Sequence, residues 1–214
     1  MRGKGFSEKG IIRKMSSRRD ISDFLVHFTK GANEEAFQRL CSIIDERQIS
    51  ATREKIKGRY KCVCFTEAPL TSLRDGLVNP DAYSLYSPFG IIFEKRRIFE
   101  LGGRPVIYQT NEEFEGLPRE YRWRHVRYEP NRYEPIDFTW EREWRIHCGV
   151  LRFDPSCAGI VVPDEDWVQR MISEHEAEQD FDVRMYSLII DDFIAEQYSE
   201  EFPWRIYPLQ QKRP

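Results

Sequence analysis

Two tryptophans frame two glutamates in the segment Phe138-Thr139-Trp140-Glu141-Arg142-Glu143-Trp144-Arg145-Ile146. The side chains of a β-strand alternate between its two faces. A strand over residues 138–148 would place Glu141, Glu143 and Arg145 on one face, with the two carboxylates roughly 6.6 Å apart. The opposite face, which carries both tryptophans, would anchor the strand against a core. The aromatic content and the apolar continuation of the segment favour this strand interpretation.

Two other interpretations of the segment remain open. On a helix, Glu141 and Arg145 would form an i,i+4 ion pair and the two tryptophans would lie near one face. Alternatively, the segment is a salt-bridged sheet edge with tryptophan anchors and no chemistry. If the strand lines a cleft, two partly desolvated like charges raise the pKa of at least one carboxyl, and Arg145 acts in the opposite direction.

Composition and length indicate one globular domain of ordinary size. The chain has 214 residues, of which 40% are hydrophobic and 14% aromatic, and its net charge of −3 indicates no particular class of partner. No apolar run approaches the length of a membrane span, and no signal peptide is recognisable. Five cysteines, an odd number, lie without zinc spacing, so we expect a reduced, cytoplasmic protein with no metal site.

The order of the expected elements predicts an α+β fold. We expect strands over residues 24–29, 62–66, 90–93, 104–108, 138–148 and 158–163, and helices that are capped by Asn33 and by Asp164. A short helix or turn should run from 67 to 80, and residues 111–133 should be partly helical. Residues 1–20 carry seven basic and two acidic side chains, which predicts a flexible basic arm before a single domain over 21–214. Strands and helices do not alternate regularly, unlike in a doubly wound fold.

Polar residues recur where the expected strands begin or end, in five motifs: His27-Phe28-Thr29, Cys64-Phe65-Thr66-Glu67-Ala68-Pro69-Leu70, Tyr86-x-x-Phe89-Gly90-Ile91, Arg104-Pro105-Val106-Ile107-Tyr108 and Glu141-Arg142-Glu143-Trp144-Arg145. The order of these motifs along the chain resembles that of ADP-ribosyltransferases. Within that superfamily the chain is most similar to the AbiGi family of abortive phage-resistance proteins, and more distantly to DarT-type enzymes that modify nucleic acid. The chain departs from the family pattern at Ser87, where a glycine is usual, and at Glu67, where an aspartate is usual.

The resemblance implies a fold and an activity. The fold would be an ADP-ribosyltransferase-like pair of split, mostly antiparallel β-sheets with flanking helices and an NAD-sized cleft between the sheets. The activity would be NAD-dependent ADP-ribosylation, by a toxin or effector in phage defence with no membrane partner. A different class remains as the alternative: a non-catalytic antitoxin or interaction module of an abortive-infection system, which binds a cognate toxin or antitoxin protein.

Cleavage of the bond between nicotinamide and ribose passes through an oxocarbenium-like transition state, and a nearby carboxylate stabilises the positive charge. The resemblance assigns this role to Glu143, the second acid of the pair, and leaves Glu141 to orient the acceptor or to hold the strand. The NAD-binding residues would be His27, Thr29, Arg53, Thr66 and Tyr86. Taken singly, His27 and Tyr86 also fit core packing, the threonines fit strand propensity, and Arg53 fits a solvated basic loop.

Arginines and aromatic residues are interleaved over residues 117–133, a pattern typical of contact with single-stranded nucleic acid. We therefore predict that Arg122, Trp123 and Arg124 bind an RNA or single-stranded DNA acceptor. The alternative is an amphipathic helix whose Trp123 and Tyr128 pack inward.

Overall fold

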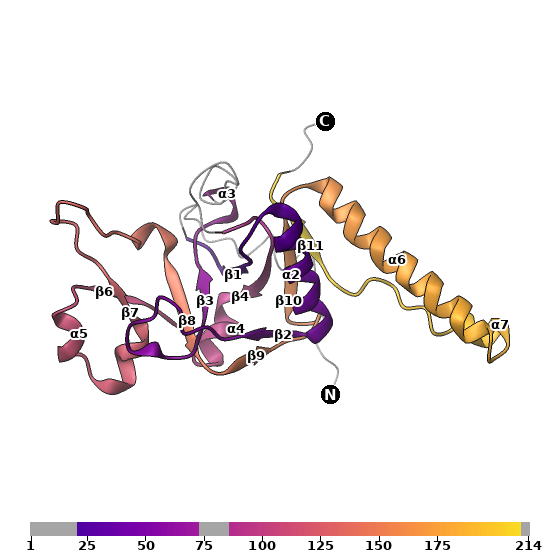
Figure 1. Ribbon diagram of the computed structural model, residues 1–214, viewed down its shortest axis with the longest axis horizontal. Helices are drawn as coiled ribbons and strands as arrows, with labels where there is room; N and C mark the ends of the chain where they lie inside the picture. The colour runs from indigo at the N-terminus through magenta and orange to yellow at the C-terminus, as the bar shows by residue number, and fades with distance from the viewer. Residues whose placement is uncertain (1–20, 73–85, 211–214) are drawn as a thin grey trace.

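The computed structural model describes residues 21–72 and 86–210, and its centre is a seven-stranded sheet (Figure 1). Neighbouring strands are antiparallel except β10 and β11, which are parallel. The class is therefore α+β with a mostly antiparallel sheet, as predicted. In spatial order the strands are β11 (Ile206–Pro208), β10 (Ala158–Val162), β4 (Gly90–Glu94), β1 (Phe24–Phe28), β3 (Cys62–Thr66), β8 (Glu143–His147) and β5 (Arg104–Pro105).

Two short strand pairs and several helices complete the described fold. Strands β2 (Gln48–Ser50) and β9 (Val150–Arg152) pair antiparallel, and β6 (Ile107–Gln109) and β7 (His125–Arg127) pair parallel. The helices are α2 (Asn33–Glu46), α3 (Leu70–Ser72), α4 (Lys95–Glu100), α5 (Glu113–Gly116), α6 (Glu165–Ser187) and α7 (Asp192–Glu196), with 3-10 helices η1 (Lys57–Arg59), η3 (Arg119–Arg124) and η4 (Thr139–Glu141). No helix in the described ranges is long and apolar enough to cross a membrane.

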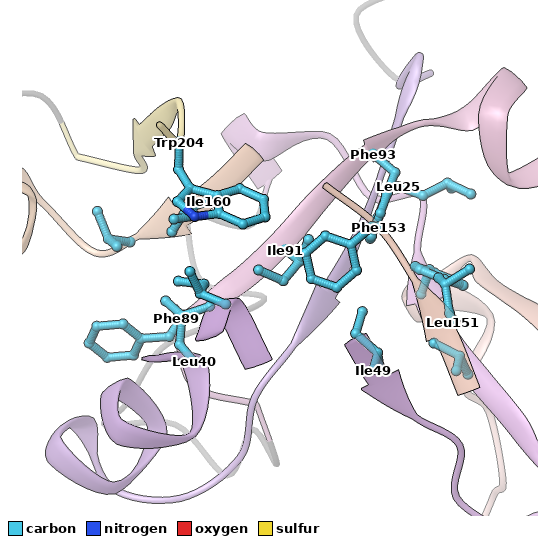
Figure 2. Close-up of a cluster of buried hydrophobic side chains, with 14 of the residues drawn as sticks. Leu25, Leu40, Ile49, Phe89, Ile91, Phe93, Leu151, Phe153, Ile160 and Trp204 are labelled. Carbon is cyan, nitrogen blue, oxygen red and sulfur yellow. The ribbon is translucent and has the colours of Figure 1, made fainter. Parts of the chain in front are cut away.

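The main core lies where α2 and the β2–β9 pair pack against the sheet (Figure 2). Strand alternation sends Leu25 of β1 into this core, whereas Val26 and Phe28 enter a second cluster on the other face. Leu40 of α2, Ile91 of β4 and Ile160 of β10 are fully buried. This packing fixes β1 and β3, whose ends carry the polar residues singled out in the sequence.

Helix boundaries agree with the apolar periodicity, but one expected cap is wrong. The buried residues of α2 are Ala36, Phe37, Leu40 and Ile44, as the spacing predicts. Asn33 is the first helical residue and not the cap; Ala32 holds the cap position without a side-chain hydrogen bond. Asp164 caps α6 as predicted, because its side chain accepts from the N–H groups of Asp166 and Trp167.

Two expected strands are interrupted. The strand expected over 104–108 is broken after Pro105, so that β5 pairs with β8 and β6 pairs with β7. The strand expected over 138–148 begins only at Glu143, because residues 139–141 form η4 and Arg142 adopts a left-handed conformation with φ 44°. Glu141 therefore lies before the strand, and the two glutamates do not share one strand face.

The remaining secondary-structure predictions are confirmed in part, or concern residues outside the described ranges. Of residues 67–80, Leu70–Ser72 form α3, whereas 73–80 and the expected basic arm 1–20 lie outside the described residues. Residues 111–133 are partly helical, in the short pieces α5 and η3. The two outer strands of the large sheet, β5 and β11, each contain a proline, Pro105 and Pro208.

Candidate active site

A cavity of about 1140 Å³ lies beside β1 and β3. Its wall is formed by these strands, the C-terminal half of α2, the connector from Ser50 to Arg59, and the segment from Phe138 to Arg145. The volume exceeds the roughly 300–1,000 Å³ of pockets for drug-sized ligands, so a dinucleotide is a suitable occupant. Seven residues singled out in the sequence line it: His27, Thr29, Arg53, Thr66, Tyr86, Glu141 and Glu143.

Glu143 is held by the arginine two residues further along β8. Arg145 Nε donates to Glu143 Oε1 at 2.7 Å, and the terminal nitrogen Nη2 donates to Oε2 at 3.1 Å. The other terminal nitrogen of Arg145 donates to the carbonyls of Trp123 and His125, at 3.1 and 2.9 Å. The Arg145 side chain is buried, and the Glu143 side chain is only 12% exposed. The orientation of Glu143 is therefore fixed by a bidentate ion pair before any ligand binds.

Glu141 is a partly buried acid that makes no ion pair with Arg145 in the way that Glu143 does. Its carboxylate accepts a long hydrogen bond of 3.4 Å from Tyr86, and its carbonyl accepts one of 2.6 Å from the Thr66 hydroxyl. Burial, together with the nearby charge of Glu143, raises the pKa of Glu141 to about 7. The sequence predicted a raised pKa for at least one of the two acids, and the structure identifies it as Glu141.

His27 offers a hydrogen-bond acceptor to the cavity. Its Nδ1 lies 2.8 Å from the carbonyl oxygen of Cys64 on β3. A carbonyl only accepts, so Nδ1 carries the hydrogen. Burial lowers the pKa of His27, which keeps the ring neutral. Nε2 is then unprotonated and accepts a hydrogen bond from a hydroxyl group.

The hydroxyl groups of Thr29 and Thr66 bind backbone carbonyls and so fix the backbone around the site. The Thr29 hydroxyl lies 3.1 Å from the carbonyls of both Ala36 and Phe89, which joins the end of β1 to α2 and to the start of β4. The Thr66 hydroxyl donates to the Glu141 carbonyl and accepts from the Ala68 N–H. Each hydroxyl has a single hydrogen, and in both threonines that hydrogen is already donated to a backbone carbonyl. Thr29 and Thr66 therefore contribute to the site by fixing the positions of His27 and Glu141.

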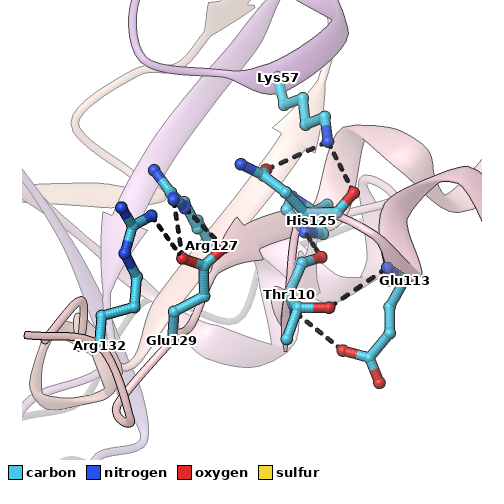
Figure 3. A network of polar contacts seen from close by, with 8 residues as sticks. Lys57, Thr110, Glu113, His125, Arg127, Glu129 and Arg132 are labelled. Atoms are coloured by element: carbon cyan, nitrogen blue, oxygen red, sulfur yellow. Dashed lines mark hydrogen bonds and ion pairs between the residues drawn. The ribbon is translucent and has the colours of Figure 1, made fainter.

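The connector between β2 and β3 supplies positive charge. Arg53, Lys55, Lys57 and Arg59 all line the cavity, and Arg53 and Arg59 form no ion pair with any described residue. Lys57 is held by Asn111, with Nζ at 2.9 Å from its carbonyl and 3.1 Å from its side-chain oxygen (Figure 3). In the same network His125 Nε2 lies 3.0 Å from the Thr110 carbonyl, which ties β7 to the β6 end. The cavity is thus lined both by a basic connector and by the acids Glu141 and Glu143.

The residues expected to bind the acceptor are used for packing. Arg122 donates to the carbonyls of Leu117 and Glu115, and Arg124 to that of Pro105. Trp123 is buried against Ile56 and Cys62, so it packs inward as the alternative interpretation predicts. None of Arg122, Trp123 and Arg124 contributes to the cavity wall.

The sequence interpretation missed two aromatic residues at the cavity. Phe138 and Trp140 line it and are 44% and 43% exposed, although the strand interpretation placed them on the core-facing side. The 3-10 turn η4 is the reason, because it replaces strand alternation at these positions. The signal that was available is the closeness of two aromatic residues to the acid pair. Tyr108 was also missed as a support: its hydroxyl accepts from the Glu143 N–H at 3.2 Å.

Comparisons of the chain with protein-family models, with curated proteins and with solved structures found no match. Within residues 21–72 and 86–210, no cluster of three or more histidine, cysteine and acidic side chains is arranged to hold a metal ion. The fold and the site define an α+β protein with a large cavity, whose lining includes the neutral His27, the acids Glu141 and Glu143, and a connector rich in lysine and arginine.

Proposed function

We propose that this protein is an NAD-dependent ADP-ribosyltransferase that modifies RNA or single-stranded DNA, acting as a toxin or effector in phage defence. The single observation that carries the enzymatic part is the convergence of His27, Glu141 and Glu143 on one cavity from β1, η4 and β8. The role in phage defence rests on the resemblance of the sequence motifs alone.

The cavity fits the chemistry of NAD⁺. The pyrophosphate is an anion, and Arg53 and Arg59 supply guanidinium groups without an ion pair among the described residues. The riboses present hydroxyl groups, for which His27 Nε2 is an acceptor. The nicotinamide ribose develops positive charge as the glycosidic bond breaks, and a negatively charged carboxylate at the cavity wall, Glu141 or Glu143, stabilises that charge.

Glu143 and Glu141 have different roles in the proposed reaction. NAD⁺ supplies the bond between nicotinamide and ribose, which breaks with its electron pair leaving on nicotinamide. Glu143 stabilises the resulting charge on the ribose; Arg145 occupies one lone pair on each of its oxygens and leaves others for a ribose hydroxyl. Glu141 takes the proton from the acceptor as the acceptor forms the new bond to the ribose carbon. Its pKa of about 7 suits a general base at neutral pH.

The acceptor contacts Trp140 and Phe138 in this proposal. Both rings are exposed at the cavity wall next to Glu141, and flat aromatic side chains stack on unpaired bases for about 1–3 kcal/mol per base. The positions of Arg122, Trp123 and Arg124 give no support to their earlier assignment as this contact, because none of them lines the cavity and each donates at least one hydrogen bond to a backbone carbonyl of the protein itself.

The test is incubation with labelled NAD⁺ and separate pools of RNA, single-stranded DNA and protein. We expect transfer of label to a nucleic-acid pool by the wild type and none by Glu143→Gln or Glu141→Gln. Glu178→Gln, an exposed site on α6, is the matched control and should retain full transfer. Absence of both transfer and NAD⁺ hydrolysis in every pool would contradict the proposal.

A second candidate function is a non-catalytic module of an abortive-infection system. The ion pair between Glu143 and Arg145 favours it, because a carboxylate that is already neutralised contributes less to a developing positive charge. Calorimetric titration with NAD⁺ separates the two functions: a protein that neither binds nor cleaves NAD⁺ but binds a cognate toxin is the module.

A further inference from the structure

The exposed apolar side chains of the described chain gather at the end of one helix. Eight of the sixteen large hydrophobic residues that are exposed lie between residues 181 and 198. Leu188, Ile189 and Phe193 are the most exposed of the eight, at 77%, 83% and 70%. Single exposed apolar residues are ordinary on protein surfaces, but a contiguous group marks a surface that another molecule covers.

This group lies on a projection formed by residues 174–201. We call this projection the arm from here on; it is a different segment from the basic residues 1–20. Helix α6 leaves the body, α7 turns back at its far end, and the chain returns alongside α6 to β11 (Figure 1). The rings of Tyr186 and Tyr198 lie 5.0 Å apart and join the two sides of the tip. Asp191 caps α7 by accepting from the Phe193 N–H. The apolar side chains are therefore displayed on folded structure.

The arm is anchored only at its base. Buried residues of α6 occur in its first two turns, at Val168 and Met171, and the Trp167 ring packs against those of Phe37 and Phe89. The helix has 23 residues and so spans roughly 35 Å at 1.5 Å per residue. Among the described residues, none after Arg145 lines the cavity, so the arm is separate from the candidate active site.

The charge of the arm restricts what covers it. The arm carries ten carboxylates against one arginine, whereas the whole chain has a net charge of only −3. Two arms would repel each other, and nucleic acid or an anionic lipid surface would be repelled as well. A partner that matches both properties presents apolar side chains surrounded by lysines and arginines.

We propose that the arm is a docking surface for a basic, amphipathic helix of a partner protein, with Leu188, Ile189 and Phe193 as its apolar centre. Apolar burial supplies the affinity, and the carboxylates around it supply the association rate and the selection against acidic partners. This surface is additional to the proposed transferase activity and does not depend on it.

The probe is a fluorescein-labelled peptide of leucine and lysine with helical periodicity, measured by fluorescence anisotropy against the full chain. We expect binding that weakens with salt, and about tenfold weaker binding of a peptide with the same composition in scrambled order. The double variant Leu188→Ser/Ile189→Ser should weaken binding of the patterned peptide by about tenfold or more. The control Leu101→Ser/Val150→Ser removes two exposed apolar residues elsewhere and should leave binding unchanged.

Circular dichroism should show that both double variants are folded, because all four substituted residues are exposed. Equal binding of the patterned and scrambled peptides would mean that the arm binds through its charge alone, and it would overturn the proposal. Light scattering over a concentration series provides the other decisive result. A dimer that is present in the wild type and absent in Leu188→Ser/Ile189→Ser would mean that a second copy of the chain covers the tip.

Discussion

Glu143 and Arg145 lie two residues apart on β8, and two hydrogen bonds of 2.7 and 3.1 Å join their side chains. The guanidinium also binds two carbonyls, of Trp123 and His125. The same arginine thus orients the acid of the candidate site and fastens the η3–β7 segment to the sheet. The geometry of the candidate site and the stability of the fold therefore depend on one buried side chain.

Arg145→Met should lower the free energy of unfolding by about 3–5 kcal/mol, because it leaves the Glu143 carboxylate and two carbonyls without their partner. Urea unfolding measures the change. The control is Arg96→Met, which breaks the exposed pair of Arg96 with Glu100 and should cost at most about 0.5 kcal/mol. A loss below about 1 kcal/mol in Arg145→Met would contradict the structural role given to this ion pair.

Glu141→Gln should stabilise the protein at pH 8 and have little effect near pH 5. Folding raises the pKa of Glu141 from 4.5 to about 7, so between these values the folded state binds more protons than the unfolded state. Stability from this group is therefore lost as pH rises through that window. After allowance for solvent screening we expect a gain of roughly 1–2 kcal/mol at pH 8. Thermal unfolding over a pH series measures it, and a pH-independent difference between variant and wild type would refute the raised pKa.

Gly90→Ala should destabilise the protein by about 1–3 kcal/mol and displace His27. A Cβ atom at residue 90 would lie 2.5 Å from the backbone oxygen of His27, which pairs with Ile91 on the adjacent strand. Gly149→Ala is the matched control, because no atom lies within 4 Å of its added Cβ. Chemical denaturation gives both values, and the His27 imidazole resonances in NMR report its displacement. Equal effects of the two substitutions would contradict the close approach of β1 and β4.

Trp140→Ala should weaken acceptor binding by roughly 5- to 150-fold, the equivalent of 1–3 kcal/mol of lost stacking, with no change in stability. Arg122→Glu/Arg124→Glu should instead lower stability and leave single-strand affinity and its salt dependence unchanged, because both arginines bind the protein's own carbonyls. Filter binding over a salt series measures both variants. A reduced salt slope in the arginine variant would restore these residues as the acceptor contact.

The parts of the fold that depend on apolar pattern were predictable from sequence. Short apolar segments with polar ends located β1 and β3, helical spacing located α2, and Asp164 marked the start of α6. The bend at Arg142 was not predictable, because a left-handed arginine has no local signature such as glycine or asparagine. The 3-10 turn η4, which ends at this bend, places Glu141 before the strand and leaves Trp140, an expected core anchor, as an exposed ring.

The convergence on the cavity followed from strand order, but the roles of individual side chains did not. The hydroxyls of Thr29 and Thr66 are occupied by carbonyls that lie close only after folding. Arginines in an aromatic-rich segment look the same in sequence whether they meet phosphates or carbonyl groups, and only tertiary structure shows that Arg122 and Arg124 meet carbonyls. The separation of the arm from the body was also invisible, because its apolar residues resemble those of an ordinary core helix.

The prolines of the two outer strands limit the addition of further strands at the edges of the large sheet. An open sheet edge recruits strands from other chains through unpaired N–H and C=O groups, and proline removes one donor from such an edge. Here Pro105 and Pro208 interrupt both edges, and β5 and β11 are only two and three residues long. Fibril-like growth by strand addition is therefore disfavoured at both ends of the sheet, so the protein should remain dispersed at high concentration even though hydrophobic side chains are exposed elsewhere on it.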